Sequence, residues 1–338
     1  MQKTISIRSR LPKSRKFIII FFVTAGIFGL SFYKIPKSTS MIGPMTFVSS
    51  QRQQPLCSSK NSYRLLSSEI ACNECRLSLR ESDGWFCELD KEWQRRKNRY
   101  YIQDRNNYFS DDATYFFLEN WHPTIQCELE RRMGTGDGGK WVCDVHKFKS
   151  ISSPPPLIYS FGSRADFAFE HAMKKEVPQS EIHTFDQNAL NCPANICVFH
   201  QTVVGDGKSN RSKSLQMIVD DLNHQGRDID ILKVDIEGSE FELFDELFKP
   251  IIVARNELQS ITTKTLSYIR QILVEIHIRS DVTKSEIRRV HAFFERFRQN
   301  NYAIFHKEAN LAECQRVFEY AFIRLNPAFF TVSKASSQ

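Results

Sequence analysis

Acidic residues are absent from the first 37 positions of this 338-residue chain, and net charge is almost absent from the rest. The whole sequence has 46 Lys and Arg residues against 39 Asp and Glu residues, a formal charge of +7. Eight of the cations lie in residues 1–37, so 46 minus 8 leaves 38 basic against 39 acidic residues, or −1. Nucleic-acid-binding proteins need a basic surface to neutralise phosphates. This balance argues against nucleic acid as a substrate or partner.

Charged residues are also missing from residues 17–33 (FIIIFFVTAGIFGLSFY), which are mostly apolar. As a helix these 17 residues span about 25 Å, near the short limit for crossing a bilayer. Six cations precede the run and only Lys34 and Lys37 follow it closely, which orients the N-terminus to the cytosol. The sequence therefore predicts a cytosolic tail at 1–16, a transmembrane signal anchor at 17–33 and a stem at 34–56. A cleaved signal peptide of a secreted protein and a buried core helix are the alternatives.

Nine cysteines fit the oxidising compartment that this orientation implies, because disulfides form there by default. Their odd number leaves at least one thiol unpaired within the monomer. We therefore predict a type II membrane protein of the endoplasmic reticulum or Golgi with a lumenal C-terminal domain. The acceptor sequence at Asn210 (NRS) would be glycosylated there if it is exposed. A zinc site begun by Cys72-x-x-Cys75, with Cys87 and His146 as distant ligands, is an alternative use of cysteine, although the spacing matches no strong zinc pattern.

The middle of the chain lacks a phosphate-binding loop and divides into two regions. The run at 134–139 (GTGDGG) has no following Lys-Ser/Thr and no apolar strand before it, so it is typical of a flexible break. Before this break we predict a cysteine-containing pre-domain at 57–140, with helices near 64–80 and 85–98. After it we predict the main domain at 141–330.

Short apolar runs alternate with helical periodicity from residue 157 onward. The runs predict seven strands, near 157–161, 181–186, 196–200, 229–235, 271–277, 302–306 and 317–325. Helical patterns lie between most of them, and the capping box Thr283-x-x-Glu286 opens the last helix. This alternation is typical of an α/β fold with a mostly parallel sheet and helices on both faces.

Polar residues or glycine follow four central strands of this predicted sheet. In an open parallel sheet, ligands bind beyond the carboxyl ends of the strands. The candidate site residues at those ends are Ser160, Gly162, Asp186, Asp235, Glu237, Glu275 and His277. Gly162 allows close approach of the backbone to a ligand. Asp186 can accept two hydrogen bonds from a ribose, although a helix cap or a solvated turn is its ordinary alternative.

Two pairs of these residues have a spacing that places both side chains on one face. Asp235 and Glu237 are two residues apart, as are Glu275 and His277. The first pair suits a cationic ligand, a divalent metal or a substrate hydroxyl. His277 titrates near neutrality, which suits a general base, whereas a lone histidine at a strand end is more often a structural hydrogen-bond partner.

Residues 229–240 (IDILKVDIEGSE) resemble the K-[IV]-D-[IV]-E-G-x-E signature of the FkbM-type and methyltransferase-like protein 24 families. Weaker matches to the latter family occur in the expected order at 140–144 (KWVCD), 159–163 (YSFGS), 183–186 (HTFD) and 272–277 (ILVEIH). The resemblance implies a Rossmann-like methyltransferase fold with a seven-stranded sheet, and S-adenosylmethionine as the methyl donor.

The resemblance also implies positions for the donor. Ser160 and Gly162 would flank its methionine moiety, Asp186 its ribose, and Asp235 would lie at the mouth of the donor site. Such folds usually have two or three glycines in the loop after the first strand, whereas only Gly162 is present here. A catalytically weak interaction protein with a methyltransferase fold is therefore one alternative function.

Methyl transfer to a hydroxyl requires alignment of the two reactants and a general base. We expect His277 or Asp235 to be that base, with Glu237 and Glu275 orienting the substrate or a metal, and we assign no resident metal site. The acceptor is expected to be a hydroxyl, on a glycan or a secreted protein, because the resembling FkbM group acts on oxygen. A lumenal glycosyltransferase is the second alternative, since residues 228–230 (DID) form a D-x-D string, but they lie at the start of a strand.

Overall fold

The computed structural model describes most of the chain beyond the predicted stem, and all of this part belongs to one compact unit, Gln54–Gln338. The described residues are 75–104, 113–151, 153–249, 268–278, 283–310, 313 and 316–331. The predicted tail, anchor and stem at 1–16, 17–33 and 34–56 lie outside them. Within the described ranges, no helix has the length and apolar character needed to cross a membrane.

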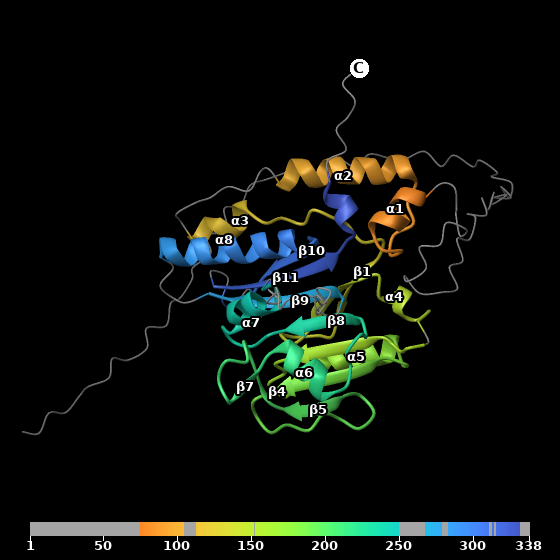
Figure 1. Ribbon diagram of the computed structural model, residues 1–338. Coiled ribbons are helices and arrows are strands. Elements are labelled where there is room, and N and C mark those ends of the chain that lie inside the picture. The colour runs from red at the N-terminus through yellow and green to blue at the C-terminus, as the bar shows by residue number, and fades with distance from the viewer. Residues whose placement is uncertain are drawn as a thin grey trace, which may run out of the picture. The chain divides into compact units, whose positions relative to one another are not determined.

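A seven-stranded sheet forms the centre of this unit (Figure 1). Its strands, in spatial order, are β10 (Tyr302–Ala309), β11 (Val317–Arg324), β9 (Ile269–His277), β8 (Ile229–Val234), β3 (Leu157–Phe161), β4 (Glu181–Asp186) and β5 (Val198–Gln201). The five strands from β9 to β5 are parallel, and β11 is antiparallel to both of its neighbours. This confirms the predicted Rossmann-like sheet, which is mixed because of β11.

Helices cover both faces of the sheet, as the alternating pattern predicts (Figure 1). One face packs against α3 (Ala113–Glu119), α6 (Leu215–Asp221), α7 (Glu240–Leu247) and α8 (Lys284–Gln299). The other packs against α1 (Arg76–Glu81), α2 (Asp90–Asp104), α4 (Val145–Phe148) and α5 (Ala168–Glu176). Because both faces are covered, β3 and β8 are buried along their whole length, which explains their continuous apolar sequences.

The capping box of α8 is present in part. The Thr283 side chain accepts a hydrogen bond from the backbone N–H of Glu286 and so caps the helix. The apolar stripe that begins at Ile287 is buried against the sheet, with Phe294 and Phe297 each 1% exposed. Local sequence therefore determines both where this helix begins and which face it buries.

The described residues between 75 and 140 share their hydrophobic core with the sheet. Trp85, Phe86 and Trp93 belong to the same buried cluster as Ile158 of β3 and Ile182 of β4. A hairpin of β1 (Glu130–Met133) and β2 (Lys140–Cys143) completes this region, and the glycine-rich run at 134–139 is its loop. The hairpin brings Lys140 to the central strands, where it takes part in the site described below.

The six cysteines of the described residues form three disulfides: Cys75–Cys87, Cys127–Cys143 and Cys192–Cys197. The first bond removes both Cys75 and Cys87 from the zinc alternative. The other three cysteines, Cys57, Cys72 and Cys314, lie outside the described residues.

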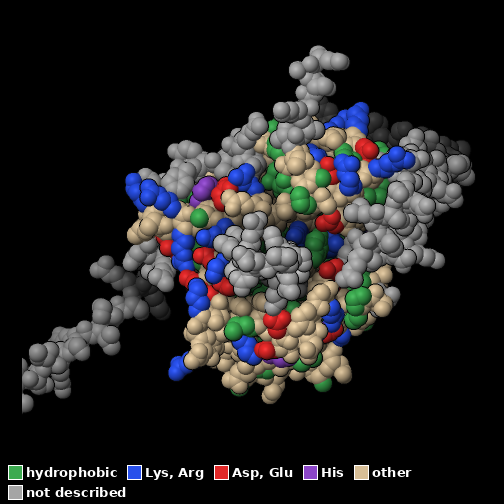
Figure 2. Space-filling view, in the orientation of Figure 1, with side chains coloured by type: hydrophobic (Ala, Val, Ile, Leu, Met, Phe, Trp, Pro, Cys, Tyr) green, Lys and Arg blue, Asp and Glu red, His purple; other side chains and the backbone are tan. Residues whose placement is uncertain are grey.

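Surface charge agrees with the balance in the sequence. On the face shown in Figure 2, basic and acidic side chains are interspersed over the described residues. A short parallel pair, β6 (Val203–Val204) and β7 (Ser212–Lys213), lies between β5 and α6 in the chain. This pair adds Val203 and Val204 to the rim of the sheet where the candidate site lies.

Candidate active site

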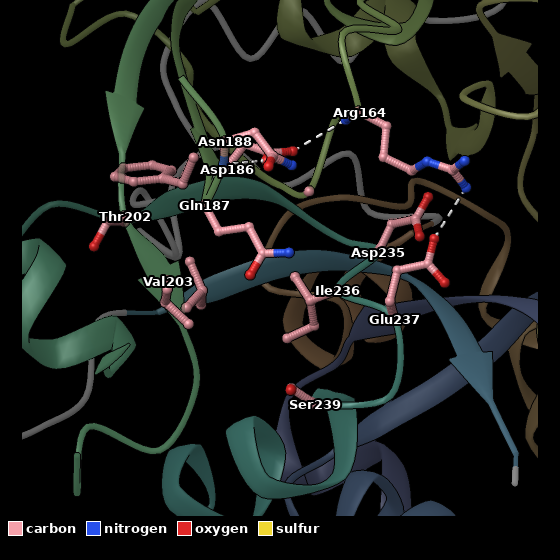
Figure 3. Close-up of a pocket in the computed structure, with 13 residues that line it drawn as sticks. Arg164, Asp186, Gln187, Asn188, Thr202, Val203, Asp235, Ile236, Glu237 and Ser239 are labelled. Atoms are coloured by element: carbon pink, nitrogen blue, oxygen red, sulfur yellow. Dashed lines mark hydrogen bonds and ion pairs between the residues drawn. The ribbon is translucent and has the colours of Figure 1, made fainter. Parts of the chain in front are cut away.

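A pocket lies beyond the carboxyl ends of β3, β4 and β8 (Figure 3). Its cavity volume is about 110 Å³, smaller than the roughly 300–1,000 Å³ of sites that enclose a whole small molecule, so a ligand of cofactor size would extend beyond it. Its lining residues are Gly162, Arg164, Phe185, Asp186, Gln187, Asn188, Thr202, Val203, Val204, Asp235, Ile236, Glu237 and Ser239. The lining contains three carboxylates and one cation, so its charge favours a positively charged ligand.

Asp186 ends β4 and is held by four hydrogen bonds from its surroundings. Its Oδ2 accepts from the backbone N–H groups of Ser163 and Arg164, both at 3.0 Å. Its Oδ1 accepts from Asn188, at 2.8 Å from the backbone nitrogen and 3.0 Å from Nδ2. Burial raises the pKa of this carboxyl, but the hydrogen bonds outweigh burial and hold the pKa below its ordinary value. The carboxylate is thus ionised, and a ligand hydroxyl must displace the Asn188 amide to gain a full hydrogen bond.

Gly162 provides the close backbone approach that its sequence position predicts, but to another strand end. Its φ is +75°, and a Cβ atom there would lie 1.7 Å from the carbonyl oxygen of Asp235. The Lys233 ammonium also donates to the Gly162 carbonyl at 2.7 Å. Ser160 lies two residues earlier, in β3, and is fully buried. It does not line the pocket, and its hydroxyl has no hydrogen-bond partner among the described residues. Gly162 therefore joins β3 to β8 at the rim.

The four predicted catalytic residues come together at the ends of β8 and β9. His277 Nε2 is 3.5 Å from Glu237 Oε2 and 3.9 Å from Glu275 Oε1, and its Nδ1 is 3.1 Å from Glu240 Oε1. Burial lowers the pKa of His277, but the hydrogen bond to Glu240 and the charges of Glu240, Glu275 and Asp235 outweigh it and raise the pKa to about 9. His277 is therefore an imidazolium at neutral pH and cannot accept a proton. Of the two predicted bases, Asp235 lines the pocket and His277 does not, so position and charge both favour Asp235.

Asp235 lines the pocket as an ionised carboxylate. Its side chain is 20% exposed, and its Oδ2 is 3.4 Å from Lys140 Nζ. Burial raises the pKa of Asp235, but the positive charges of Lys233, Lys140 and His277 outweigh burial and lower the pKa below its ordinary value. A half-buried anion is thus held at the pocket wall by cations that lie behind it and beside it.

Glu275 lies behind the pocket instead of lining it. It is 4% exposed, and its Oε2 is 2.7 Å from Lys140 Nζ. Lys140 also contacts Glu319 of β11. Burial raises the pKa of Glu319 to about 8, with Lys140 opposing and Glu275 adding to the rise. Glu275, Glu319 and Asp235 therefore share the one buried cation of Lys140.

Glu237 occupies the exposed side of the pocket. Its side chain is 56% exposed and forms an ion pair with Arg164 at 3.2 Å (Figure 3). Glu237 has φ +55°, Arg164 +45° and Ala165 +66°. Residues other than glycine rarely adopt this left-handed backbone, and such strain clusters at functional sites. Both loops that carry the ion pair are therefore held in unusual conformations around the pocket.

Glu240 and Lys140 are site residues to which the sequence reasoning gave no role. Glu240 is fully buried, and its carboxylate accepts from the backbone N–H groups of Ile236 and Gly238 as well as contacting His277. It thus shapes the loop after β8 and sets the charge of the imidazole. A signal was present for each: Glu240 ends the DIEGSE block, and Lys140 begins KWVCD.

Comparison with known proteins gives one family match. The family is described as a methyltransferase domain and matches residues 76–324, which is 249 of 338 residues. The match begins inside the region predicted as a pre-domain. No curated protein matches the chain.

Several solved structures are similar at low identity. The fibrillarin pre-rRNA processing protein of Methanococcus jannaschii is 11% identical, with 60% of this chain and 85% of that one covered and a TM-score of 0.33. The O-methyltransferase from Bacillus cereus, in complex with SAH, is 11% identical, with 50% and 74% covered and a TM-score of 0.30. A putative ribosomal RNA methyltransferase from Plasmodium falciparum is 13% identical, with 50% and 86% covered and a TM-score of 0.30.

Proposed function

Because the chain belongs to the methyltransferase-domain family, we propose that it transfers a methyl group from S-adenosylmethionine to a hydroxyl group. The observation that carries this proposal is Asp235, an ionised and half-buried carboxylate on the wall of the pocket. We propose oxygen as the acceptor atom because a hydroxyl must lose its proton during methyl transfer, and this carboxylate can accept that proton.

S-adenosylmethionine is the methyl donor that a methyltransferase domain implies, and the residues of the pocket fit its chemistry. The donor carries a sulfonium and an ammonium group, and the lining has three carboxylates against the single cation of Arg164. Val203, Val204 and Ile236 offer apolar surface for a flat base. Asp186 is placed to receive ribose hydroxyls once Asn188 moves. When bound, the cofactor supplies an electrophilic methyl group.

Asp235 has the properties of a base that acts late in the reaction. Its lowered pKa makes it a weak base toward a neutral hydroxyl. A hydroxyl oxygen becomes strongly acidic as it gains a methyl group, so a weak base is sufficient to take up the released proton. His277, as an imidazolium beside Glu237, would hold Glu237 and the substrate in place. Alignment of the two reactants accounts for most of the rate increase in this scheme.

One alternative activity is disfavoured by the placement of the D-x-D string. Asp230 is 4% exposed, lies at the amino end of β8, and accepts a hydrogen bond from the backbone N–H of Leu157 at 2.8 Å. Asp230 therefore has a structural role at the amino ends of the strands, opposite the carboxyl ends where the pocket lies. A metal–nucleotide site of a glycosyltransferase does not match this position.

We further propose that the domain is lumenal and that the acceptor is a glycan or a secreted protein. Three disulfides support an oxidising compartment, and Asn210 of the NRS sequence is exposed. The anchor predicted at 17–33 remains part of this proposal. Protease treatment of sealed microsomes should leave the domain intact, whereas its digestion without detergent would contradict the lumenal placement.

Calorimetric titration of the purified full chain tests the donor assignment. S-adenosylmethionine and its demethylated product should each bind with one-to-one stoichiometry, and UDP-sugars should not. Transfer is then measured with donor labelled in the methyl group and with hydroxyl-bearing glycans as acceptors. Binding of a nucleotide sugar would refute the proposal, and binding of the donor without transfer to any acceptor would favour the interaction protein.

A further inference from the structure

A second cluster of ionisable side chains lies away from the pocket, at the other end of β4. Glu181 begins this strand, His183 follows two residues later, and Asp186 of the pocket ends it. At about 3.3 Å per residue, Glu181 and Asp186 are about 16 Å apart along the strand. His224 joins the cluster from the segment after α6, which packs on this side of the sheet (Figure 1). The cluster is therefore separate from the donor site.

Three possible ligand atoms converge in this cluster. Glu181 Oε1 is 2.9 Å from His183 Nε2 and 3.1 Å from His224 Nε2. All three atoms lie within 4.8 Å of one another. Ligand atoms about 2.0–2.1 Å from a tetrahedral zinc ion are about 3.4 Å apart. Shifts of a few tenths of an ångström would therefore open room for the ion.

Each imidazole has a second polar partner that would fix its orientation as a ligand. His224 Nδ1 is 2.7 Å from the Tyr159 hydroxyl oxygen, and His183 Nδ1 is 2.9 Å from His200 Nε2. Histidines bound to metals generally use their remaining ring nitrogen in such a hydrogen bond. Both rings therefore turn Nε2 toward the carboxylate and Nδ1 toward a separate partner.

The carboxylate has matching support and a path to solvent. Arg227 donates from its NH1 group to Glu181 Oε2 at 2.8 Å, which leaves Oε1 facing the two rings. His183 and His224 are buried, at 7% and 8% exposure, whereas the Glu181 side chain is 31% exposed. Water can therefore reach a fourth coordination position beside Glu181. Two imidazoles with one carboxylate and an open position are an established ligand set for zinc.

We propose that Glu181, His183 and His224 bind one zinc ion, with water as the fourth ligand. The ion would join β4 to the segment after α6. In a plain hydrogen-bond network, by contrast, both Nε2–H groups would donate to the same carboxylate oxygen and no metal would be needed. The two arrangements differ in one measurable property, which is stoichiometric metal binding.

The test uses the full chain, freed of metal with a chelator and titrated with zinc alone. We expect one tightly bound zinc ion, release of which lowers the melting temperature. X-ray absorption of the zinc protein should show two imidazole ligands with oxygen and without sulfur. A sulfur ligand would assign the ion to cysteine and overturn the proposal, as would failure to retain zinc at micromolar concentration.

Variants locate the ion. His224→Gln and Glu181→Gln should each lose at least tenfold in zinc affinity, and His171→Gln on the exposed face of α5 is the matched control. His277→Gln is the second control, because Asp235, Glu237 and His277 also converge within 4.8 Å. Loss of zinc in His277→Gln with retention in His224→Gln would overturn the proposal. If the first two variants do not fold, the ligands seen by X-ray absorption in the wild type decide the question.

Discussion

Replacing Lys140 by methionine should weaken both the fold and the donor site. Lys140 is 2% exposed, and its ammonium lies 2.7 Å from Glu275 and 3.4 Å from Asp235. Methionine preserves most of the volume of the side chain but removes the charge. Two carboxylates would then face each other in a buried space without their cation, which raises their free energy.

The expected loss follows from the burial of this cluster. Removal of one partner from a buried ion pair costs about 3–5 kcal/mol, because the remaining charge is uncompensated. A change of 1 kcal/mol shifts the melting temperature of a domain of this size by about 2–4 °C, so the variant should melt about 6–20 °C lower. Lys149→Met is the matched control, since Lys149 is 50% exposed beside Glu176 and such pairs contribute less than about 1 kcal/mol.

The measurement is thermal and urea unfolding of both variants, at neutral and at acidic pH. Acid should narrow the difference between wild type and Lys140→Met, because the orphaned carboxylates take up protons and lose their repulsion. Calorimetry should also show weaker donor binding as Asp235 shifts. Equal stability of Lys140→Met and Lys149→Met, or a deficit that grows in acid, would refute the electrostatic reasoning.

Four further predictions concern the pocket. Asp186→Ala should lower donor affinity at least tenfold by calorimetry while circular dichroism shows that the secondary structure is retained, because the change removes both the acceptor for the ribose and the hydrogen bonds that hold Ser163, Arg164 and Asn188 at the pocket; unchanged affinity would exclude Asp186 from the donor site. Asp235→Asn should abolish most single-turnover methyl transfer while donor affinity falls less, and full activity would exclude it as the base. The pKa of His277 is about 9 in the folded protein, against an ordinary value of 6.5. Its contribution to the free energy of unfolding, about 3 kcal/mol, is therefore complete below about pH 6.5 and disappears as the pH rises through about 9. The free energies of unfolding of wild type and His277→Gln in urea should converge over that range, and a constant difference would contradict the prediction. Gly162→Ala should fold poorly or melt much lower, since the added Cβ meets the Asp235 carbonyl at 1.7 Å, and a normal melting temperature would show that the two loops separate easily.

Sequence patterns predict the sheet well because each central strand is an apolar run that is buried on both faces. β3 and β4 begin and end at the predicted residues, and the capping threonine of α8 is where the box places it. Boundaries shift in other strands: the third predicted strand moves to Val198–Gln201, and the fifth begins two residues earlier, at Ile269. The alternation of strands and helices predicts a mostly parallel sheet, but it does not specify the order of the strands or the antiparallel β11.

The electrostatics of the site could not be read from the sequence in the same way. Asp235 and His277 do lie at one rim, as their positions at strand ends predict. The charge of His277 depends on Glu240, which belongs to another element, and that of Asp235 depends on Lys140, which is 95 residues away in the chain. Spacing along one strand carries no information about such partners. The membrane anchor predicted at 17–33 lies outside the described residues and stays a prediction.

The shared core of residues 75–140 and the sheet also fixes the order in which the protein can be completed during synthesis. Trp93 packs against Phe329, at a centroid distance of 5.5 Å. These residues are 329 minus 93, or 236, positions apart, and a ribosome needs roughly 10–50 s to make that length. The disulfides Cys75–Cys87 and Cys127–Cys143 close loops of only 12 and 16 residues. They can therefore form before Phe329 has been synthesised and can pack against Trp93. Until the last strand and the segment after it emerge, the apolar residues of this region lack part of the core that buries them.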